Sequence, residues 1–170
     1  MDIHIFWEGP FELKDKSKIN NESKDYGIYQ VYGHHPIYGN SVLLYIGLAV
    51  NQTFATRIAQ ETWSDRPDPL NTHIYIGRLA GRMKVDIDTW DGLIERAEKL
   101  LIYAHKPVLN TQNTKSLKEG DFLDDRIYNW GSHRDLFPEV STRRFISSNF
   151  EHISEDQIYD ASMDTRVDNE

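Results

Sequence analysis

The sequence predicts an α+β domain, a small antiparallel β-sheet flanked by helices whose central elements follow the order β-β-α-β-α. Two runs rich in β-branched and aromatic residues, 26–32 and 42–47, are separated by a turn-rich insert, as expected of an antiparallel hairpin. Apolar residues at helical spacing follow, then a further strand-like run, and then a longer stretch with helical spacing. An N-terminal strand and a C-terminal β-hairpin are expected to extend this core.

Length and composition are consistent with one domain. A chain of 170 residues can bury about two-thirds of its surface and needs no disulfide or structural metal to fold. We expect a single domain over 1–150, with a core at about 25–110 and extensions at 1–24 and 111–150. The sequence has no cysteine, which excludes thiolate metal sites and catalytic thiols. No apolar run approaches the length needed to cross a membrane, so we expect a cytoplasmic protein without a membrane partner.

The N-terminal extension and the hairpin come first along the chain. Residues 1–9 alternate apolar and polar side chains and are expected to form an edge strand, whereas 11–25 are a polar connection. The hairpin insert, 33–40, contains Gly, Pro and Asn and predicts a loop longer than the minimum. His34 and His35 lie in this loop, where contact with a substrate and plain solvation are both open.

Two helices are predicted after the hairpin. The first starts near Asn51, carries Phe54 and Ile58 at four-residue spacing, and ends at Pro67 and Pro69. A strand at 73–77 follows. The second helix begins near Asp88 or Thr89 and runs to about His105, with Pro107 beyond it. Its expected apolar stripe comprises Leu93, Ala97, Leu100, Leu101 and Ala104.

The C-terminal part divides into a hairpin and an acidic tail. Two short strand-like runs, 126–130 and 136–140, are separated by a Gly-Ser pair. Residues 151–170 hold seven acids and one arginine, a net charge of −6 out of −8 for the whole chain, so that 1–150 carry −2. The tail is expected to be weakly ordered, and the near-neutral body does not exclude a nucleic-acid partner.

Two charged side chains, Glu98 and Arg57, could carry chemistry. Helical geometry places Glu98 at the edge of the apolar stripe, while Glu95 points outward and can pair with Lys99. A partly desolvated carboxylate either is compensated by a cation or has a raised pKa, and Mg²⁺ is a suitable partner. Arg57 offers a fork of donors that matches a phosphate. Each residue taken alone also fits an ordinary surface or boundary role.

Two tripeptides in the predicted strands, Gly27-Ile28-Tyr29 and Tyr45-Ile46-Gly47, stand one hairpin apart. Arg57 follows ten residues after the second tripeptide, and Glu98 and Asn110 come later in that order. In these anchors the chain resembles the GIY-YIG nuclease family over about 25–110. The resemblance implies tyrosines on adjacent strands, the arginine on the next helix and the glutamate on a later one.

The resemblance also implies roles for five residues. Tyr29 would orient or deprotonate the attacking water, Tyr45 would assist on the phosphate side, and Arg57 would hold the phosphate. Glu98 would bind one divalent metal ion, Mg²⁺ or Mn²⁺, and Asn110 would hold the backbone of the site. A free tyrosine has a pKa of about 10, which suits general-base work near neutrality poorly, so something must lower it or share the proton.

The chain departs from the family pattern one helical turn after the arginine. Many members have Tyr or His there, whereas this chain has Glu61. Glu61 could pair with Arg57, weaken its hold on phosphate, or act as a second metal ligand. His73 could replace the missing group, although a lone strand histidine is more often structural; His35 is a further auxiliary candidate.

The resemblance therefore predicts a metal-dependent endonuclease that hydrolyses phosphodiester bonds of nucleic acid, with DNA as the expected partner and a 5′-phosphate and 3′-hydroxyl as products. Repair, restriction and defence against foreign DNA are all open settings. The alternative is a catalytically weak or inactive GIY-YIG fold that binds nucleic acid or protein. The sequence does not determine target choice or oligomeric state.

Overall fold

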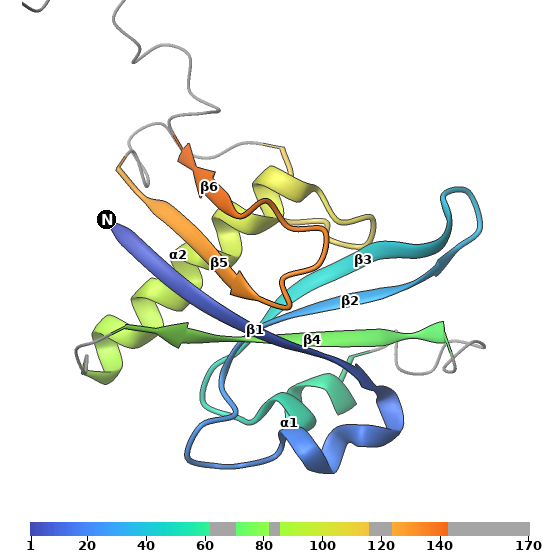
Figure 1. The fold of residues 1–170 in the computed structure, drawn as a ribbon, viewed down its shortest axis with the longest axis horizontal. Helices are drawn as coiled ribbons and strands as arrows, with labels where there is room; N and C mark the ends of the chain where they lie inside the picture. The colour runs from blue at the N-terminus through green and yellow to red at the C-terminus, as the bar shows by residue number, and fades with distance from the viewer. Residues whose placement is uncertain (62–70, 82–85, 116–123, 143–170) are drawn as a thin grey trace, which may run out of the picture.

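The computed structural model describes residues 1–61, 71–81, 86–115 and 124–142, and these form an α+β fold (Figure 1). Along the chain the elements are β1 (Asp2–Glu12), the 3-10 helix η1 (Leu13–Ile19), β2 (Gly27–His35), β3 (Gly39–Ala49), α1 (Phe54–Ala59), β4 (His73–Ala80), α2 (Ile87–His105), β5 (Arg126–Gly131) and β6 (Glu139–Ser141). The predicted order β-β-α-β-α is observed from β2 to α2. None of the described helices is long and apolar enough to cross a membrane.

All six strands in the described residues belong to one sheet, in the order β3-β2-β4-β1-β5-β6. One face packs against α2 through a core that includes Ile28, Ile46, Leu100 and Leu101. The opposite face of β2 and β4 packs against η1 and α1 through a second core centred on Phe54. Figure 1 shows η1 and α1 side by side, with α2 on the other side of the sheet.

The prediction of a purely antiparallel sheet with β1 at its edge is wrong. β1 pairs antiparallel with β4 and parallel with β5, so it lies inside a mixed sheet. Its alternation of Ile3, Ile5 and Trp7, all buried, reports which face of the strand is covered. Alternation does not report how many neighbours the strand has, and a parallel partner can join only through a long crossover, which here contains most of the chain.

The hairpin strands are longer than predicted. β2 continues to His35 and β3 starts at Gly39, which leaves only 36–38 as the loop. The pairing shifts register between Val31 and Tyr32 and again between Gly33 and His35. These irregularities explain why the strands are longer than predicted, because they let the hydrogen bonding between β2 and β3 continue through residues that are typical of turns.

The first helix is shorter than predicted and starts later. Thr53 caps α1 by accepting a hydrogen bond from the Thr56 amide, while Asn51 has a left-handed φ of 63°. The helix ends at Ala59, well before the predicted end at Pro67 and Pro69, which lie outside the described residues.

The second helix closely follows its prediction. Asp86 caps α2, which starts at Ile87 and ends at the expected His105; Lys106 then adopts a left-handed conformation. The buried positions are Ile94, Ala97, Leu100, Leu101 and Ile102. Leu93 and Ala104 of the predicted stripe are only partly buried, so the buried face is rotated slightly from the expected one.

The extensions agree in part with expectation. β5 and β6 form the predicted antiparallel hairpin, but β6 starts only at Glu139, and Leu136 is buried in the connection before it. The stretch expected to be a polar connection contains η1, whose Ile19 is buried in the second core. The acidic tail, 151–170, lies outside the described residues.

Candidate active site

Tyr29, Arg57 and Glu61 form one hydrogen-bonded network on the α1 side of the sheet. The buried Tyr29 hydroxyl donates to Glu61 Oε1 over 2.9 Å. The same oxygen accepts from Arg57 Nη2 at 2.7 Å. Of the three roles open to Glu61, the ion pair with Arg57 is therefore present. Glu61 reaches both partners because it lies directly after the C-cap of the short α1 helix.

Arg57 is fixed at one further point. Its Nε donates to the Leu48 carbonyl at 3.3 Å, which ties the helix to the end of β3. Nη1 makes no hydrogen bond to any residue in the described ranges. The Arg57 side chain is about one-third exposed, so it keeps a donor and an accessible surface for an anion.

At the glycine of each tripeptide, the surrounding atoms leave no room for a side chain. Gly47 pairs with Tyr29 across the hairpin, and a Cβ at Gly47 would lie 2.6 Å from the Tyr29 hydroxyl oxygen. Gly27 has a φ of +142°, and a Cβ there would overlap the carbonyl oxygen of Gly77 on β4. Glycine at position 47 therefore makes room for the Tyr29 ring to lie across β3 towards Glu61.

Tyr45 lies beside Tyr29, with ring centroids 6.0 Å apart and planes inclined by 37°. Burial, and then the negative charge of Glu61, raise the pKa of Tyr45, while Arg57 partly opposes the rise. Burial and Glu61 likewise raise the pKa of Tyr29 above its ordinary value. Of the two alternatives, a lowered tyrosine pKa or a shared proton, the first is not met: the pKa of Tyr29 is raised, and its hydroxyl donates a hydrogen bond to Glu61.

Glu98 approaches the same group of side chains from α2. Burial raises its pKa from 4.5 to about 7, and Lys99 and Arg57 oppose the rise electrostatically. The Glu98 charge in turn acts on Tyr45. Within the described part of the chain, Glu98 makes no hydrogen bond or ion pair, whereas Glu95 pairs with Lys99 at 3.8 Å as predicted.

Asn110 holds the backbone of the second tripeptide. Its Oδ1 accepts from the Ile46 amide at 3.0 Å and its Nδ2 donates to the Ile46 carbonyl at 2.8 Å. One residue earlier, the Leu109 amide donates to the Leu44 carbonyl at 2.9 Å. These bonds cover part of the otherwise unpaired edge of β3 and fix the strand that carries Tyr45.

The structure does not bring the two auxiliary histidines to this network. His73 pairs with Tyr32, so it lies on the α2 side of the sheet, whereas Tyr29 faces α1. His35 stacks on Tyr38 with centroids 4.9 Å apart, and its Nδ1 accepts from the Ile37 and Tyr38 amides. His35 thus has a local role in the hairpin loop.

The donor set is compatible with a single hard cation at Glu98. The carboxylate is largely buried and unpaired within the described residues, a state that a cation would relieve. Mg²⁺ commonly takes only one or two protein carboxylates and completes its shell with water and substrate phosphate. The described residues contain no group of three or more His, Asp or Glu side chains arranged to hold a metal.

The arrangement can therefore do three things chemically. Arg57 can bind an anion, Glu98 can hold a hard cation next to it, and the network of Tyr29 and Glu61 can orient a water molecule and accept its proton.

Comparisons of the chain with protein-family models, with curated proteins and with solved structures found no match.

Proposed function

We propose that this chain is a GIY-YIG-type endonuclease that hydrolyses phosphodiester bonds of nucleic acid, with DNA as the substrate and one Mg²⁺ or Mn²⁺ ion as cofactor. The observation that carries the proposal is the convergence of Tyr29, Tyr45, Arg57 and Glu98 from four different elements, β2, β3, α1 and α2. Phosphoryl transfer needs little covalent chemistry from a protein, so positioning and charge stabilisation are the main requirements.

The roles proposed for these residues are those that the family resemblance implies, and the surroundings of each residue are compatible with them. Glu98 would hold the ion, which when bound supplies Lewis-acid stabilisation of a phosphoryl oxygen. Arg57 uses Nη1 and its exposed face to bind the scissile phosphate. Tyr45, whose ring lies beside that of Tyr29, would assist on the phosphate side.

In this proposal Tyr29 is not the base that activates the attacking water. Because the raised pKa keeps Tyr29 protonated, its hydroxyl orients the water and does not remove a proton. Glu61 Oε2 makes no hydrogen bond within the described residues and is available to take the proton. The residue that departs from the family pattern thereby becomes the proton acceptor.

The first test is cleavage of plasmid and single-stranded DNA with Mg²⁺ or Mn²⁺, compared with Glu98→Ala. Cleavage by the native protein and its loss in the folded variant are expected. Glu95→Gln is the matched control, since Glu95 lies one turn away on α2 and is exposed. Absence of cleavage of any nucleic acid by the native protein would contradict the proposal.

The Arg57–Glu61 ion pair specifically favours the alternative of an inactive binding module, because Glu61 competes with phosphate for the guanidinium. Glu61→Gln separates the two roles. If Glu61 accepts the proton, the variant loses most of the cleavage rate while binding DNA at least as tightly. A faster variant would mean that Glu61 only restrains Arg57, and a native protein that binds without cleaving would establish the binding module.

A further inference from the structure

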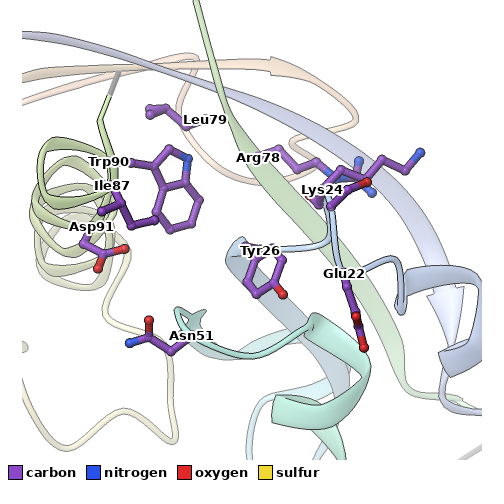
Figure 2. Close-up of a pocket in the computed structure, with 10 residues that line it drawn as sticks. Glu22, Lys24, Tyr26, Asn51, Arg78, Leu79, Ile87, Trp90 and Asp91 are labelled. Carbon is purple, nitrogen blue, oxygen red and sulfur yellow. Dashed lines mark hydrogen bonds between the residues drawn. The ribbon is translucent and has the colours of Figure 1, made fainter. Parts of the chain in front are cut away.

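A cavity of about 720 Å³ lies outside the catalytic network, between the first turns of α2 and the start of β2 (Figure 2). Trp90 enters it from α2 and Tyr26 from the opposite wall, as Figure 2 shows. Ile87, which is 68% exposed, adds apolar surface on the α2 side. The volume is in the range of pockets that hold small organic ligands, and two aromatic walls suit a flat, unsaturated one.

Polar groups in the same cavity lack partners among the described residues. Asp91 Oδ1 is buried without a hydrogen bond, which costs free energy that a ligand donor would recover. The Asn51 side chain offers a donor and an acceptor and forms no hydrogen bond with a described residue. A flat ligand with donors and acceptors along its edge satisfies both the aromatic walls and these groups, which is the chemistry of a nucleobase.

The charged groups of the lining are mixed, with acidic Glu22 and Asp91 and basic Lys24 and Arg78. Lys24 is exposed at the cavity and its Nζ makes no ion pair within the described residues, so it can meet a phosphate outside the aromatic walls. Arg78, by contrast, is bonded to Glu8, Asp25 and the Lys24 carbonyl and forms a fixed part of the wall. The cavity therefore combines a stacking site with one exposed cation, Lys24, that has no ion-pair partner among the described residues.

The cavity and the candidate active site share α2. Asp91 and Glu98 are seven residues apart and so lie on the same face of the helix, about 10.5 Å apart along its axis. Asn51 is likewise only six residues from Arg57, in the turn before α1. With a rise of about 3.4 Å per nucleotide in a stacked strand, this separation corresponds to about three nucleotides.

We propose that this cavity binds one unstacked nucleobase of the substrate strand, within about three nucleotides of the scissile phosphate. The inference rests on the proposed nuclease function and adds a determinant of substrate choice to it. Unpaired or easily unpaired positions are favoured substrates, because a base in a stable duplex must first leave its stack.

The test is an abasic scan in the Glu98→Gln background, which removes cleavage from the binding measurement. Single-stranded oligonucleotides carry one abasic residue at successive positions around the mapped cleavage site. One position near the site is expected to lose about five- to one-hundred-fold in affinity, the range for one stacked base. Trp90→Leu, which keeps an apolar side chain, should lower the affinity for the intact oligonucleotide by a similar factor. It should not lower further the affinity for the oligonucleotide that is abasic at the sensitive position.

Two other variants make the scan decisive. Tyr26→Leu tests the opposite wall and keeps the experiment informative if Trp90→Leu does not fold. Trp130→Ala is the matched control, because Trp130 is 51% exposed and is not part of the cavity lining. Retention of the abasic penalty in both folded cavity variants, or its removal by Trp130→Ala, would overturn the inference.

The remaining outcomes separate this inference from the proposed function. Glu98-dependent cleavage with a flat abasic scan would overturn the base site and leave the nuclease intact. Absence of all nucleic-acid binding and cleavage would overturn both. A free nucleoside monophosphate that quenches Trp90 fluorescence without competing with the oligonucleotide would assign the cavity to a separate small ligand, which also contradicts the inference.

Discussion

Replacing Glu98 with glutamine should stabilise the protein at alkaline pH even though we expect it to abolish cleavage. Burial raises the pKa of Glu98 from 4.5 to about 7, so the folded protein binds this proton more tightly than the unfolded chain does. At about 1.36 kcal/mol per pKa unit, ionising the buried carboxylate costs on the order of 3 kcal/mol. Glutamine has a similar volume and no charge, and so removes this cost.

The sign of the pH dependence follows from the direction of the pKa change. Below about pH 4.5 the carboxyl is protonated in both states, and native protein and Glu98→Gln should have nearly equal free energies of unfolding. As pH rises from 4.5 through 7, the native protein loses stability that the variant keeps. By pH 8 the variant should be more stable by about 2 to 3 kcal/mol.

Urea denaturation from pH 4 to pH 8.5 in EDTA, followed by circular dichroism, measures this difference directly. Glu95→Gln should show no comparable pH-dependent gain, because Glu95 is exposed. Saturating Mg²⁺ at pH 8 should restore stability to the native protein and not to Glu98→Gln, because only the native protein has the ligand. A difference that does not vary with pH would refute the reasoning, since it would mean that Glu98 is not desolvated.

Four further predictions concern the hairpin, α2 and the tail. Asn110→Ala removes both hydrogen bonds to the Ile46 backbone and should lower the free energy of unfolding by about 1 to 3 kcal/mol; an unchanged melting temperature would contradict this. Gly47→Ala should displace the Tyr29 hydroxyl and abolish cleavage with little loss of secondary structure, whereas Gly92→Ala, which meets nothing within 4 Å, should stabilise α2 by up to about 1 kcal/mol. Retained cleavage in folded Gly47→Ala would remove the steric argument. Truncation after Phe150 should tighten DNA binding, most at low salt, because the tail carries a net charge of −6; equal affinities at low salt would show that the tail does not oppose binding.

Local patterns in the sequence predict local features of the fold. The hairpin, the α2 helix and the C-terminal hairpin follow from periodicity and turn residues, because neighbours along the chain determine them. The partnership of Arg57 and Glu61 was also among the predictions, since residues four apart on a helix face one another. The parallel pairing of β1 with β5 joins segments more than 120 residues apart, and no local pattern specifies such a partner.

The candidate site shows the same division. Its residues could be named from their order in the sequence, and the position of Glu98 at the edge of the α2 stripe predicted a partly desolvated carboxylate. The protonation of Tyr29 could not be predicted, because it depends on burial under α1 together with the Glu61 charge. The cavity lined by Trp90 and Tyr26 brings together α2 and the segment before β2, and neither residue belongs to a motif.

The interior position of β1 has a consequence for how the chain folds during synthesis. β1 is synthesised before both of its partners: antiparallel β4 follows about 70 residues later and parallel β5 about 120 residues later. Until then the two edges of a strand with three large apolar side chains are unpaired, a state that invites association with other chains. Contacts of such high sequence separation also slow folding. We therefore expect the yield of folded protein to depend on translation rate and on chaperones that hold nascent chains.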